Sequence, residues 1–335
     1  MRNIAIDFGT VNTLIAIKGR GIVLREPSAV AIASDGQREP LAFGGEAMQM
    51  LGRTPGGINV VYPMRDGVVA DYELSAKMLK YFIQMALGHK VGALGVRLVL
   101  CLPLCVTEVE RRALAEAARG AGARDVLMLD EPLAAAVGAE LPVFEPVGSM
   151  VADIGGGTTD VAVLALGGIA ASASVRSGGT HLDAAIREHV QKAHGVMIGE
   201  RMAEEIKITI GNAMPGGTQR MQVRGRKLDT GLPTSLILNA GEIAHAIAPA
   251  VSRIIAAIKD ALSVTPPELA GDLYSSGITL TGGGAQLQGL DKLVAQETGM
   301  PVYVEESPLD CVALGALRML DRQEAFTEVA HPLEA

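Results

Sequence analysis

The chain carries the same short pattern twice, and this repeat constrains its fold more than any other feature. An apolar strand, Asp-x-Gly, two small residues, Asn/Thr-Thr and a second apolar strand occur in "NIAIDFGTVNTLIAI" (3–17) and again in "MVADIGGGTTDVAV" (150–163). A shift of 146 positions places Asp7 on Asp153. One Asp-x-Gly hairpin is usually only a turn, but two copies that each head one half of the chain indicate a duplicated lobe.

Both hairpins have the composition of an anion-binding turn. Glycines let the backbone come close to an anion, and successive turn N–H groups form a concave nest for negative charge. The hydroxyls of Thr10, Thr158 and Thr159 and the amide of Asn12 can add donors. Two such hairpins that face each other would hold a polyphosphate from both sides.

A carboxylate ends the first strand of each hairpin, where it would repel a phosphate unless a cation lies between them. Mg²⁺ takes oxygen ligands and keeps several of its waters when it bridges carboxylates and phosphates. We therefore expect Asp7 and Asp153 to hold Mg²⁺, largely through water.

The composition fits two lobes of ordinary size and argues against several other classes. The 335 residues are 49% hydrophobic but only 3% aromatic, which predicts an aliphatic, alanine-rich core. A net charge of −8, with no cluster of Lys or Arg, predicts that nucleic acid is not a partner. The sequence has no uninterrupted run of 18 apolar residues, so we expect no membrane span. The strand pattern starts at Asn3, so we also expect no signal peptide.

Hydrophobic periodicity predicts hairpins at the start of each half and alternating strands and helices after them, which is typical of two similar α/β lobes. Strands are expected at 4–9, 13–19, 21–33, 97–103, 125–131, 149–156, 159–166, 277–283 and 301–306. Helices are expected at 72–87, 107–122, 131–141, 180–195, 199–211, 240–263 and 287–299. Pro249 should kink or break the helix at 240–263.

Two further segments are compatible with nucleotide contacts but have simpler interpretations. "ITLTGGGAQLQGLDKL" (278–293) begins like a dinucleotide-binding fingerprint, yet its last glycine position holds Leu287, so that motif fails. A flat glycine turn against a purine or ribose remains open. In "GERMAEEIKITIG" (199–211), Glu204 and Lys207 share a helix face, and the residues alone favour a surface ion pair.

Together these segments resemble a known family. "DFGTVNT", "DIGGGTTD", "EPLAAAVG" and "TGGGAQLQGL" are similar to the phosphate, connecting and adenosine motifs of the actin, Hsp70 and sugar-kinase superfamily. "REPSAVAI", "MLGRTPGGINVVYPMRDGVVADYE" and "IGERMAEEIKITIG" resemble the MreB family of bacterial actins in particular. The similarity runs from about residue 3 to about residue 320.

The resemblance implies an actin-like α/β fold, in which two duplicated, ribonuclease H-like lobes surround a nucleotide cleft and each lobe has a smaller subdomain. The implied division places 1–32, 67–146 and 310–335 in subdomain IA, 33–66 in IB, 147–181 and 241–309 in IIA, and 182–240 in IIB.

The resemblance also implies roles for individual residues. Those expected to bind ATP are Thr10, Val11, Asn12, Gly155, Gly156, Gly157, Glu204, Glu205, Ile206, Lys207, Gly282, Gly283, Gly284 and Ala285. Glu131 would orient the attacking water, with help from Thr158. A helix-start acid stabilised by the helix dipole is the alternative for Glu131. A loosely placed carboxylate predicts slow ATP hydrolysis, which suits polymer turnover rather than metabolism.

The implied function is that of a cytoskeletal filament that maintains rod shape. Such a protein assembles with ATP and Mg²⁺ into paired antiparallel protofilaments in the cytoplasm, on the inner face of the plasma membrane. Its further partners are inner-membrane lipid and the membrane proteins of the cell-elongation machinery, which it organises for cell-wall synthesis. The alternative is an Hsp70-like or sugar-kinase-like ATPase of the same fold that does not polymerise. The sequence leaves ATP or GTP preference open.

Three features bear on assembly or depart from the family pattern. Val109, Ala113 and Ala117 form a small, flat helix face that is implied to join protofilaments, although the same face could be core. Asp160 stands where the family usually has Glu, which puts its contact with the cleft in doubt. His181 stands where the family tends to have an acid, and we expect it to be a surface residue at a helix start.

The segment between Gln84 and Arg97 is implied to touch the membrane through Val91, Leu94 and Val96. Burial of one large aliphatic side chain contributes about 1.5–3 kcal/mol, so we expect weak binding by one subunit. A filament multiplies weak sites through effective concentration, and the polymer should therefore bind membrane much better than the monomer. An ordinary helix-to-strand connection is the alternative.

Overall fold

The computed structural model describes residues 2–34, 39–53, 57–88, 95–320 and 331–332. Its strands are β1 (Arg2–Phe8), β2 (Asn12–Ile17), β3 (Gly21–Pro27), β4 (Val30–Ala33), β5 (Pro40–Phe43), β6 (Ile58–Val61), β7 (Met64–Arg65), β8 (Val68–Val69), β9 (Val96–Leu102), β10 (Ala123–Asp130), β11 (Ser149–Ile154), β12 (Thr159–Ala165), β13 (Gly168–Val175), β14 (Val196–Met197), β15 (Arg220–Lys227), β16 (Pro233–Asn239), β17 (Ile278–Thr281), β18 (Val302–Val304) and β19 (His331–Pro332). Its helices are α1 (Gly44–Met50), α2 (Tyr72–Leu87), α3 (Glu108–Gly120), α4 (Glu131–Gly138), α5 (Gly179–His194), α6 (Glu200–Ile210), α7 (Ala240–Ser263), α8 (Pro267–Ser276), the short 3₁₀ helix η1 (Gly283–Gln286), α9 (Leu290–Thr298) and α10 (Cys311–Met319).

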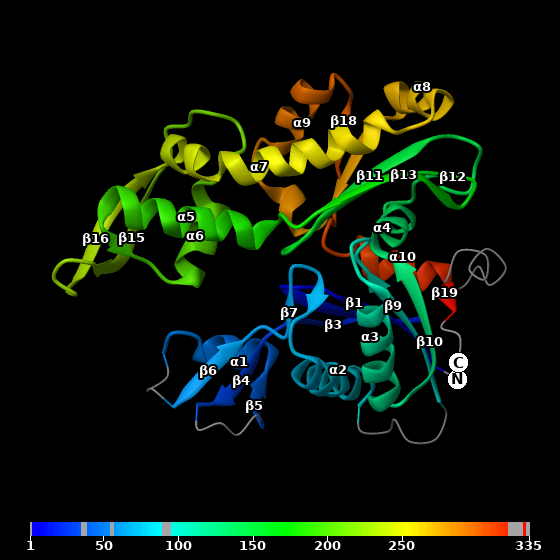
Figure 1. The fold of residues 1–335 in the computed structure, drawn as a ribbon, viewed down its shortest axis with the longest axis horizontal. Coiled ribbons are helices and arrows are strands. Elements are labelled where there is room, and N and C mark those ends of the chain that lie inside the picture. The colour runs from blue at the N-terminus through cyan, green and yellow to red at the C-terminus, as the bar shows by residue number, and fades with distance from the viewer. Residues whose placement is uncertain (1, 35–38, 54–56, 89–94, 321–330, 333–335) are drawn as a thin grey trace.

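Two large sheets with matching strand order form the centres of the two lobes (Figure 1). One runs β3-β2-β1-β9-β10-β19 and the other runs β13-β12-β11-β17-β18, so the first five strands correspond in order. The first hairpin of each sheet even has the same register, because Asp7 pairs with Leu14 as Asp153 pairs with Asp160. The duplicated lobe predicted from the repeat is therefore confirmed.

The alternation of side chains along the first strand of each lobe decides where its aspartate points. In β1, Ile4 packs with α2 and α3, whereas Ala5 packs on the opposite face with α4 and α10. Asp7 lies two residues after Ala5 and leaves the same face of the strand. In β11, Val151 packs in the same α4–α10 layer, and Asp153 lies two residues after it. Both carboxylates are thus directed into the layer between the lobes.

Helices α4 and α10 fill this layer and join the lobes (Figure 1). Helix α4 contacts β11 and β12 of one sheet, and α10 contacts β1, β2 and β9 of the other. Their backbones touch where they cross, because a Cβ atom on Gly138 would lie 1.9 Å from the carbonyl oxygen of Cys311. A Cβ atom on Gly315 would lie 1.8 Å from the carbonyl oxygen of Ala134. Glycine at both positions therefore sets how closely the lobes approach.

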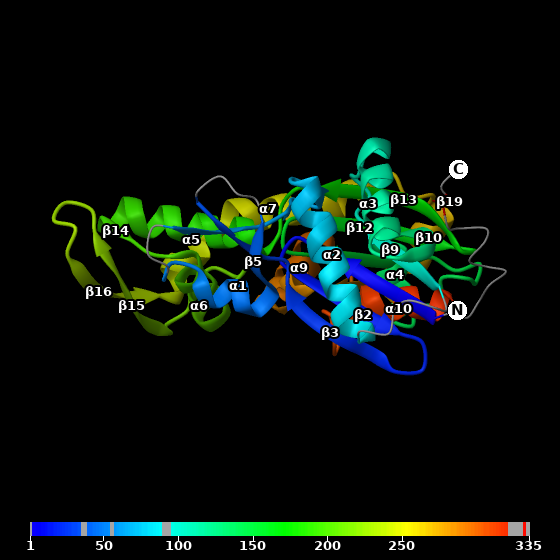
Figure 2. The ribbon, with the colours of Figure 1, turned by 90° about the horizontal axis from the view of Figure 1, so that it is seen from below.

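Each large sheet has a smaller three-stranded sheet beside it. One is β5-β4-β6, covered by α1, and the other is β14-β15-β16, which packs with α5 and α6. Figure 2 shows β15 and β16 at one end of the long axis and β19 at the other. The small sheets agree with a smaller subdomain in each lobe, and the boundaries given above stay a prediction.

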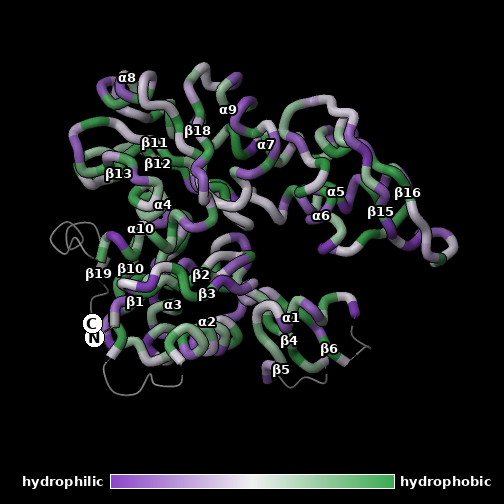
Figure 3. The backbone as a smooth tube through the Cα atoms, turned by 180° about the vertical axis from the view of Figure 1, so that it is seen from behind, coloured by the Kyte–Doolittle hydropathy of each residue, from purple (hydrophilic) through white to green (hydrophobic). Residues whose placement is uncertain are grey.

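Helix α7 is the core helix of the second lobe. Within the described ranges it is the one helix long and apolar enough to cross a membrane, but 50% of its most apolar window is buried inside the protein. It packs on β12 and β13, and Figure 3 shows hydrophobic residues along the strands of both large sheets. Of the kink or break predicted at Pro249, the break is wrong, since α7 is one continuous helix, and the kink stays a prediction. Buried Ile247 and Val251 beside Pro249 hold the helix on the core.

The small-residue face of α3 divides into an open part and a core part. Val109 is 78% exposed near the start of the helix, whereas Ala117 is 3% exposed and belongs to the core. A capping box of Thr107 and Glu110 begins the helix. Of this small-residue face, only the first turns of α3 are therefore open to a partner.

Candidate functional site

The two hairpin turns are built alike. The Gly9 N–H donates to the carbonyl oxygen of Asn12 at 3.1 Å, and the Gly155 N–H donates to that of Thr158 at 2.8 Å. Both donor and acceptor are shifted by the 146 positions of the sequence repeat. The same local sequence thus closes the same turn at the end of each central strand.

The two turns also lie against each other between the lobes. A Cβ atom on Gly156 would lie 2.2 Å from Cγ2 of Val11, and one on Gly157 would lie 2.6 Å from Oγ1 of Thr10. Glycine is therefore required here by the close approach of the opposite hairpin. The structure brings the predicted phosphate residues of both halves together.

Side chains from neighbouring segments fix both turns. On the first turn, the Ser28 N–H donates to the carbonyl oxygen of Val11 at 2.8 Å, and the Ser28 hydroxyl donates to that of Gly9 at 2.7 Å. On the second turn, the Thr180 hydroxyl at the start of α5 donates to the carbonyl oxygen of Gly156 at 2.9 Å. One expected phosphate donor is wrong, because the buried Thr159 hydroxyl instead donates to the Ser177 carbonyl oxygen at 2.7 Å.

Three carboxyl groups meet behind the turns, and each has a raised pKa. Burial, followed by the charge of Asp153, raises the pKa of Asp7 from 3.8 to about 8. Burial raises the pKa of Asp153 to about 7, although its Oδ1 accepts a 2.9 Å hydrogen bond from the Thr281 hydroxyl. Burial and the charges of Asp7, Asp160 and Asp153 raise the pKa of Glu131 well above its usual range. These acids repel one another across the layer between the lobes.

This donor set fits a divalent cation. The carboxylates are oxygen ligands, which Mg²⁺ requires, and they come from equivalent ends of two strands that face one space. A buried carboxylate without a compensating positive charge keeps its proton, and the raised pKa values of Asp7 and Asp153 express that cost. A cation between Asp7 and Asp153 would offset it.

Asp160 has a structural contact that the sequence argument left in doubt. Its Oδ1 accepts a hydrogen bond from the Leu104 N–H at 3.0 Å, and its side chain is 1% exposed. Leu104 follows β9 of the first lobe, so Asp160 links the two halves. The repeat itself carries the signal, since Asp160 matches Leu14 of the first copy. An acid at a leucine position of a core strand indicates a specific partner.

Helix α6 reaches the start of α5, which lies against the second hairpin, through Lys207. Its Nζ donates to Asp183 Oδ2 at 2.9 Å and to the carbonyl oxygen of Gly179 at 3.2 Å. Glu204 is partly exposed one turn earlier, and Glu205 is exposed. The side chain of Ile206 is 0% exposed and belongs to the core, so it offers a ligand only its backbone. The partner of Lys207 that sequence reasoning missed is Asp183.

The third glycine segment closes the same space. Gly282 has φ +78°, and a Cβ atom on it would lie 2.8 Å from Asp153 Oδ1. Gly283, Gly284 and Ala285 follow in η1, where Ala285 is buried. The segments after α6 and η1 pair directly, since the Ala213 N–H donates to the Gln288 carbonyl oxygen at 2.8 Å. The predicted ribose, adenine and phosphate residues therefore lie on adjoining elements.

Asp66 and His181 add a bridge between the halves that the sequence argument missed. Asp66, in the β7–β8 turn with φ +51°, lies 3.7 Å from Nε2 of His181. His181 Nδ1 accepts the Gly178 N–H at 3.3 Å, which confirms its expected place at a helix start. The neighbouring Gly67 N–H donates to Thr10 Oγ1 at 3.0 Å. This turn therefore touches the tips of both hairpins.

Of the three residues predicted to contact the membrane, one is buried in the structure and two lie outside the described residues. Val96 begins β9 and is 3% exposed, so its prediction as a membrane contact is wrong. It pairs with Arg2 and Ala123 on either side, which fixes it in the sheet. Val91 and Leu94 belong to the segment 89–94, which lies outside the described residues.

Known proteins share this arrangement. The family model of "MreB/Mbl protein" matches residues 1–328. The cell shape-determining protein MreB of Escherichia coli (strain K12) is 50% identical over 326 residues, which cover 95% of this chain and 94% of the relative. The crystal structure of Spiroplasma citri MreB5 bound to AMPPNP superimposes with a TM-score of 0.90 at 34% identity, covering 98% of each chain. MreB5 bound to ADP gives the same values. The predicted actin-like fold is confirmed.

Asp7→Asn is expected to raise the thermal midpoint of the nucleotide-free chain at about pH 7 in EDTA. Between 3.8 and about 8, the folded state keeps a proton on Asp7 that the unfolded state has lost, so stability falls as the pH rises through this window. Asparagine has no proton to lose in this range, so the variant avoids this loss of stability. The difference in thermal midpoint between the variant and the unmodified chain should disappear towards about pH 4. Differential scanning fluorimetry across this range measures it.

Exposed Asp260 on α7 supplies the control, because Asp260→Asn should give no gain that grows with pH. An Asp7→Asn midpoint equal to that of the unmodified chain at about pH 7 would contradict the argument.

Proposed function

The chain belongs to the MreB/Mbl protein family, and from this premise we propose that it is a nucleotide-dependent, filament-forming protein that determines cell shape. The observation that carries the proposal is the contact between two glycine hairpins from duplicated lobes, with a carboxylate behind each, Asp7 partly buried and Asp153 buried. Support also comes from the E. coli relative, named for cell shape, and from MreB5, whose crystal structure holds AMPPNP.

ATP is the proposed nucleotide. Backbone N–H groups of the turns Thr10–Asn12 and Gly155–Gly157 would bind its phosphates from opposite sides, because turn amides form anion nests, with Gly155 contributing close approach since its own N–H bonds to Thr158. Glu204 and Lys207 on α6 and the glycine turn at Gly282 would bind the nucleoside. Lys207 would share its charge between the ligand and Asp183, its present partner. Asp7 and Asp153 would hold Mg²⁺, which neutralises phosphate charge when bound.

Glu131 is the proposed residue for water orientation. It is the first residue of α4, is 6% exposed, and faces the charges of Asp7 and Asp153. Buried Thr158, in the turn of the second hairpin, is the other candidate for positioning the water. Phosphoryl transfer depends mainly on positioning and charge neutralisation, so one oriented carboxylate suffices for slow hydrolysis.

Self-assembly gives the direct test of the proposal. Light scattering with Mg-ATP should rise above a critical protein concentration, because filament growth is cooperative. The same chain in EDTA without nucleotide is the matched control and should scatter weakly. Flat scattering at all concentrations, together with ATP binding, would instead favour a non-polymerising ATPase of the same fold.

Glu131→Gln is expected to lower phosphate release at least about tenfold, while ATP affinity and assembly persist. The amide keeps the size of the buried side chain but loses the charge that orients water. Glu145→Gln is the control, since it removes an equal charge from an exposed carboxylate. Phosphate release from Glu131→Gln equal to that of the control would remove Glu131 from this role.

The proposed place of assembly is the inner face of the plasma membrane, with partners in the cell-elongation machinery. Support comes from family membership and from the apolar residues Val91 and Leu94. Without Val96, two aliphatic side chains remain, each contributing about 1.5–3 kcal/mol when fully buried. Binding should therefore depend on polymer, through effective concentration.

Liposome flotation measures this dependence. ATP-assembled polymer should float with vesicles and the monomer should not, whereas Leu94→Glu polymer should remain at the bottom of the gradient. Leu41→Glu on β5 changes another exposed leucine and serves as the control. Equal flotation of both variants would exclude the segment as the membrane contact.

A further inference from the structure

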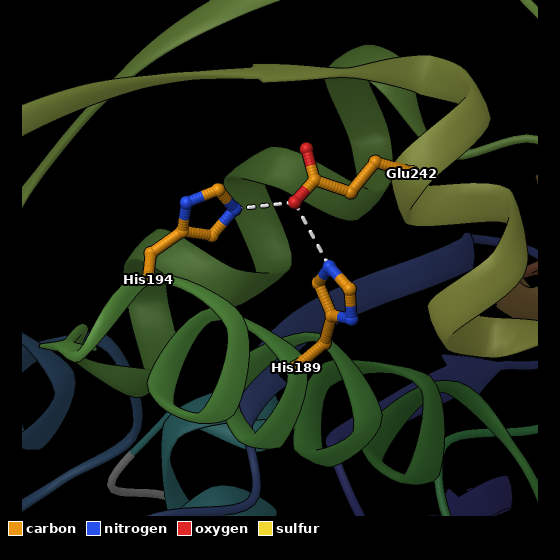
Figure 4. A group of neighbouring side chains, drawn as sticks. All are labelled: His189, His194 and Glu242. Carbon is orange, nitrogen blue, oxygen red and sulfur yellow. Dashed lines mark hydrogen bonds and ion pairs between the residues drawn. The ribbon is translucent and has the colours of Figure 1, made fainter.

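Two histidines and one glutamate converge at the end of α5 and the start of α7 (Figure 4). His189 Nε2 lies 2.9 Å from Glu242 Oε1, and His194 Nε2 bonds to the same oxygen. The two imidazole rings are 6.2 Å apart between centroids and nearly perpendicular. Their Nε2 atoms and the carboxylate oxygen all lie within 4.8 Å of one another.

Local structure holds this arrangement before any ligand binds. Asn239 caps α7, where its Oδ1 accepts the Glu242 N–H at 2.9 Å and its Nδ2 donates to Glu242 Oε2 at 3.4 Å. One carboxylate oxygen is thereby held, and the other is directed to the histidines. Gly195, in the left-handed conformation, ends α5 directly after His194 and orients the last turn towards α7.

The donor atoms suit a first-row transition metal. Imidazole nitrogen and carboxylate oxygen bind Zn²⁺ at about 2.0–2.2 Å, so neighbouring ligands of a tetrahedral ion lie about 3.3 Å apart. The His189–Glu242 contact of 2.9 Å is shorter than that spacing, and all three ligand atoms lie within 4.8 Å of one another, so small side-chain rotations would bring them to the spacing that a metal needs. The three side chains are 23%, 31% and 18% exposed, so an ion can enter from solvent.

We propose that His189, His194 and Glu242 form a binding site for a divalent transition metal of the Zn²⁺ class. Three protein ligands leave the fourth tetrahedral position to water. The metal would tie the end of α5 to the start of α7 in the second lobe. It would act apart from the nucleotide, since His194 lies 15 residues after Gly179 on one helix, which is about 22 Å of helix.

Isothermal titration with Zn²⁺ on the full, nucleotide-free chain in excess Mg²⁺ tests the site. We expect saturable binding that weakens at least about tenfold in His189→Gln and in His194→Gln. Glutamine keeps a donor for Glu242 but is a poor zinc ligand, so the fold should persist. His245→Gln is the matched control, because His245 is exposed on the same helix α7 and outside the cluster. Its affinity should equal that of the unmodified chain.

Two further measurements make the result independent of any folding defect. Co²⁺ added to the unmodified chain should give the strong visible absorption of a tetrahedral site with nitrogen ligands, and Zn²⁺ should displace it. Asn239→Ser keeps a helix cap but loses the donor to Glu242 Oε2, and should bind Zn²⁺ about tenfold more weakly. Absence of saturable Zn²⁺ binding, or equal binding by His189→Gln and His245→Gln, would overturn the proposal.

Discussion

Repulsion between carboxylates at the meeting point of two lobes is the constraint on which the site depends. Asp7 and Asp153 end equivalent strands, and the strand period directs both into the layer that α4 and α10 fill. Their raised pKa values record the cost of placing two acids there. A divalent cation bound with a polyphosphate would replace this repulsion by attraction, because both acids would then face the positive charge of the cation. Closure of the lobes is thereby linked to what lies between them.

The crossing of α4 and α10 determines how this link can act. Their backbones touch at Gly138 and Gly315, where no larger residue fits, so the lobes cannot slide apart along this line without separating the helices. Glu131 begins α4, only two turns from Gly138, so the close contact of the two helices also fixes where Glu131 stands.

Much of the central fold could be predicted from the sequence, and the periphery could not. The helices at 72–87 and 240–263 have the predicted ends. A long run of apolar residues at helical spacing identifies a helix clearly. The expected strand 21–33 divides at Ser28 into β3 and β4, where the Ser28 side chain bonds to the first hairpin. Strands β15 and β16 were missed because most of their side chains are exposed. Their sequences therefore carry only a weak form of the alternation of apolar and polar residues that marks a half-buried strand.

The parts of the site that occur in both copies of the repeat were predicted, and the parts that differ between the copies were missed. The equivalent turns and acids follow from a single shift of the sequence. Asp160 and Asp66 do not, since Leu14 stands in place of Asp160 in the first copy. Yet Asp160 bonds to Leu104 across the lobes, and Asp66 lies beside His181. Two identical halves could bind a symmetric anion equally on both sides. The unequal contacts between the halves would give a nucleotide one orientation, with Glu131 as the proposed neighbour of its terminal phosphate.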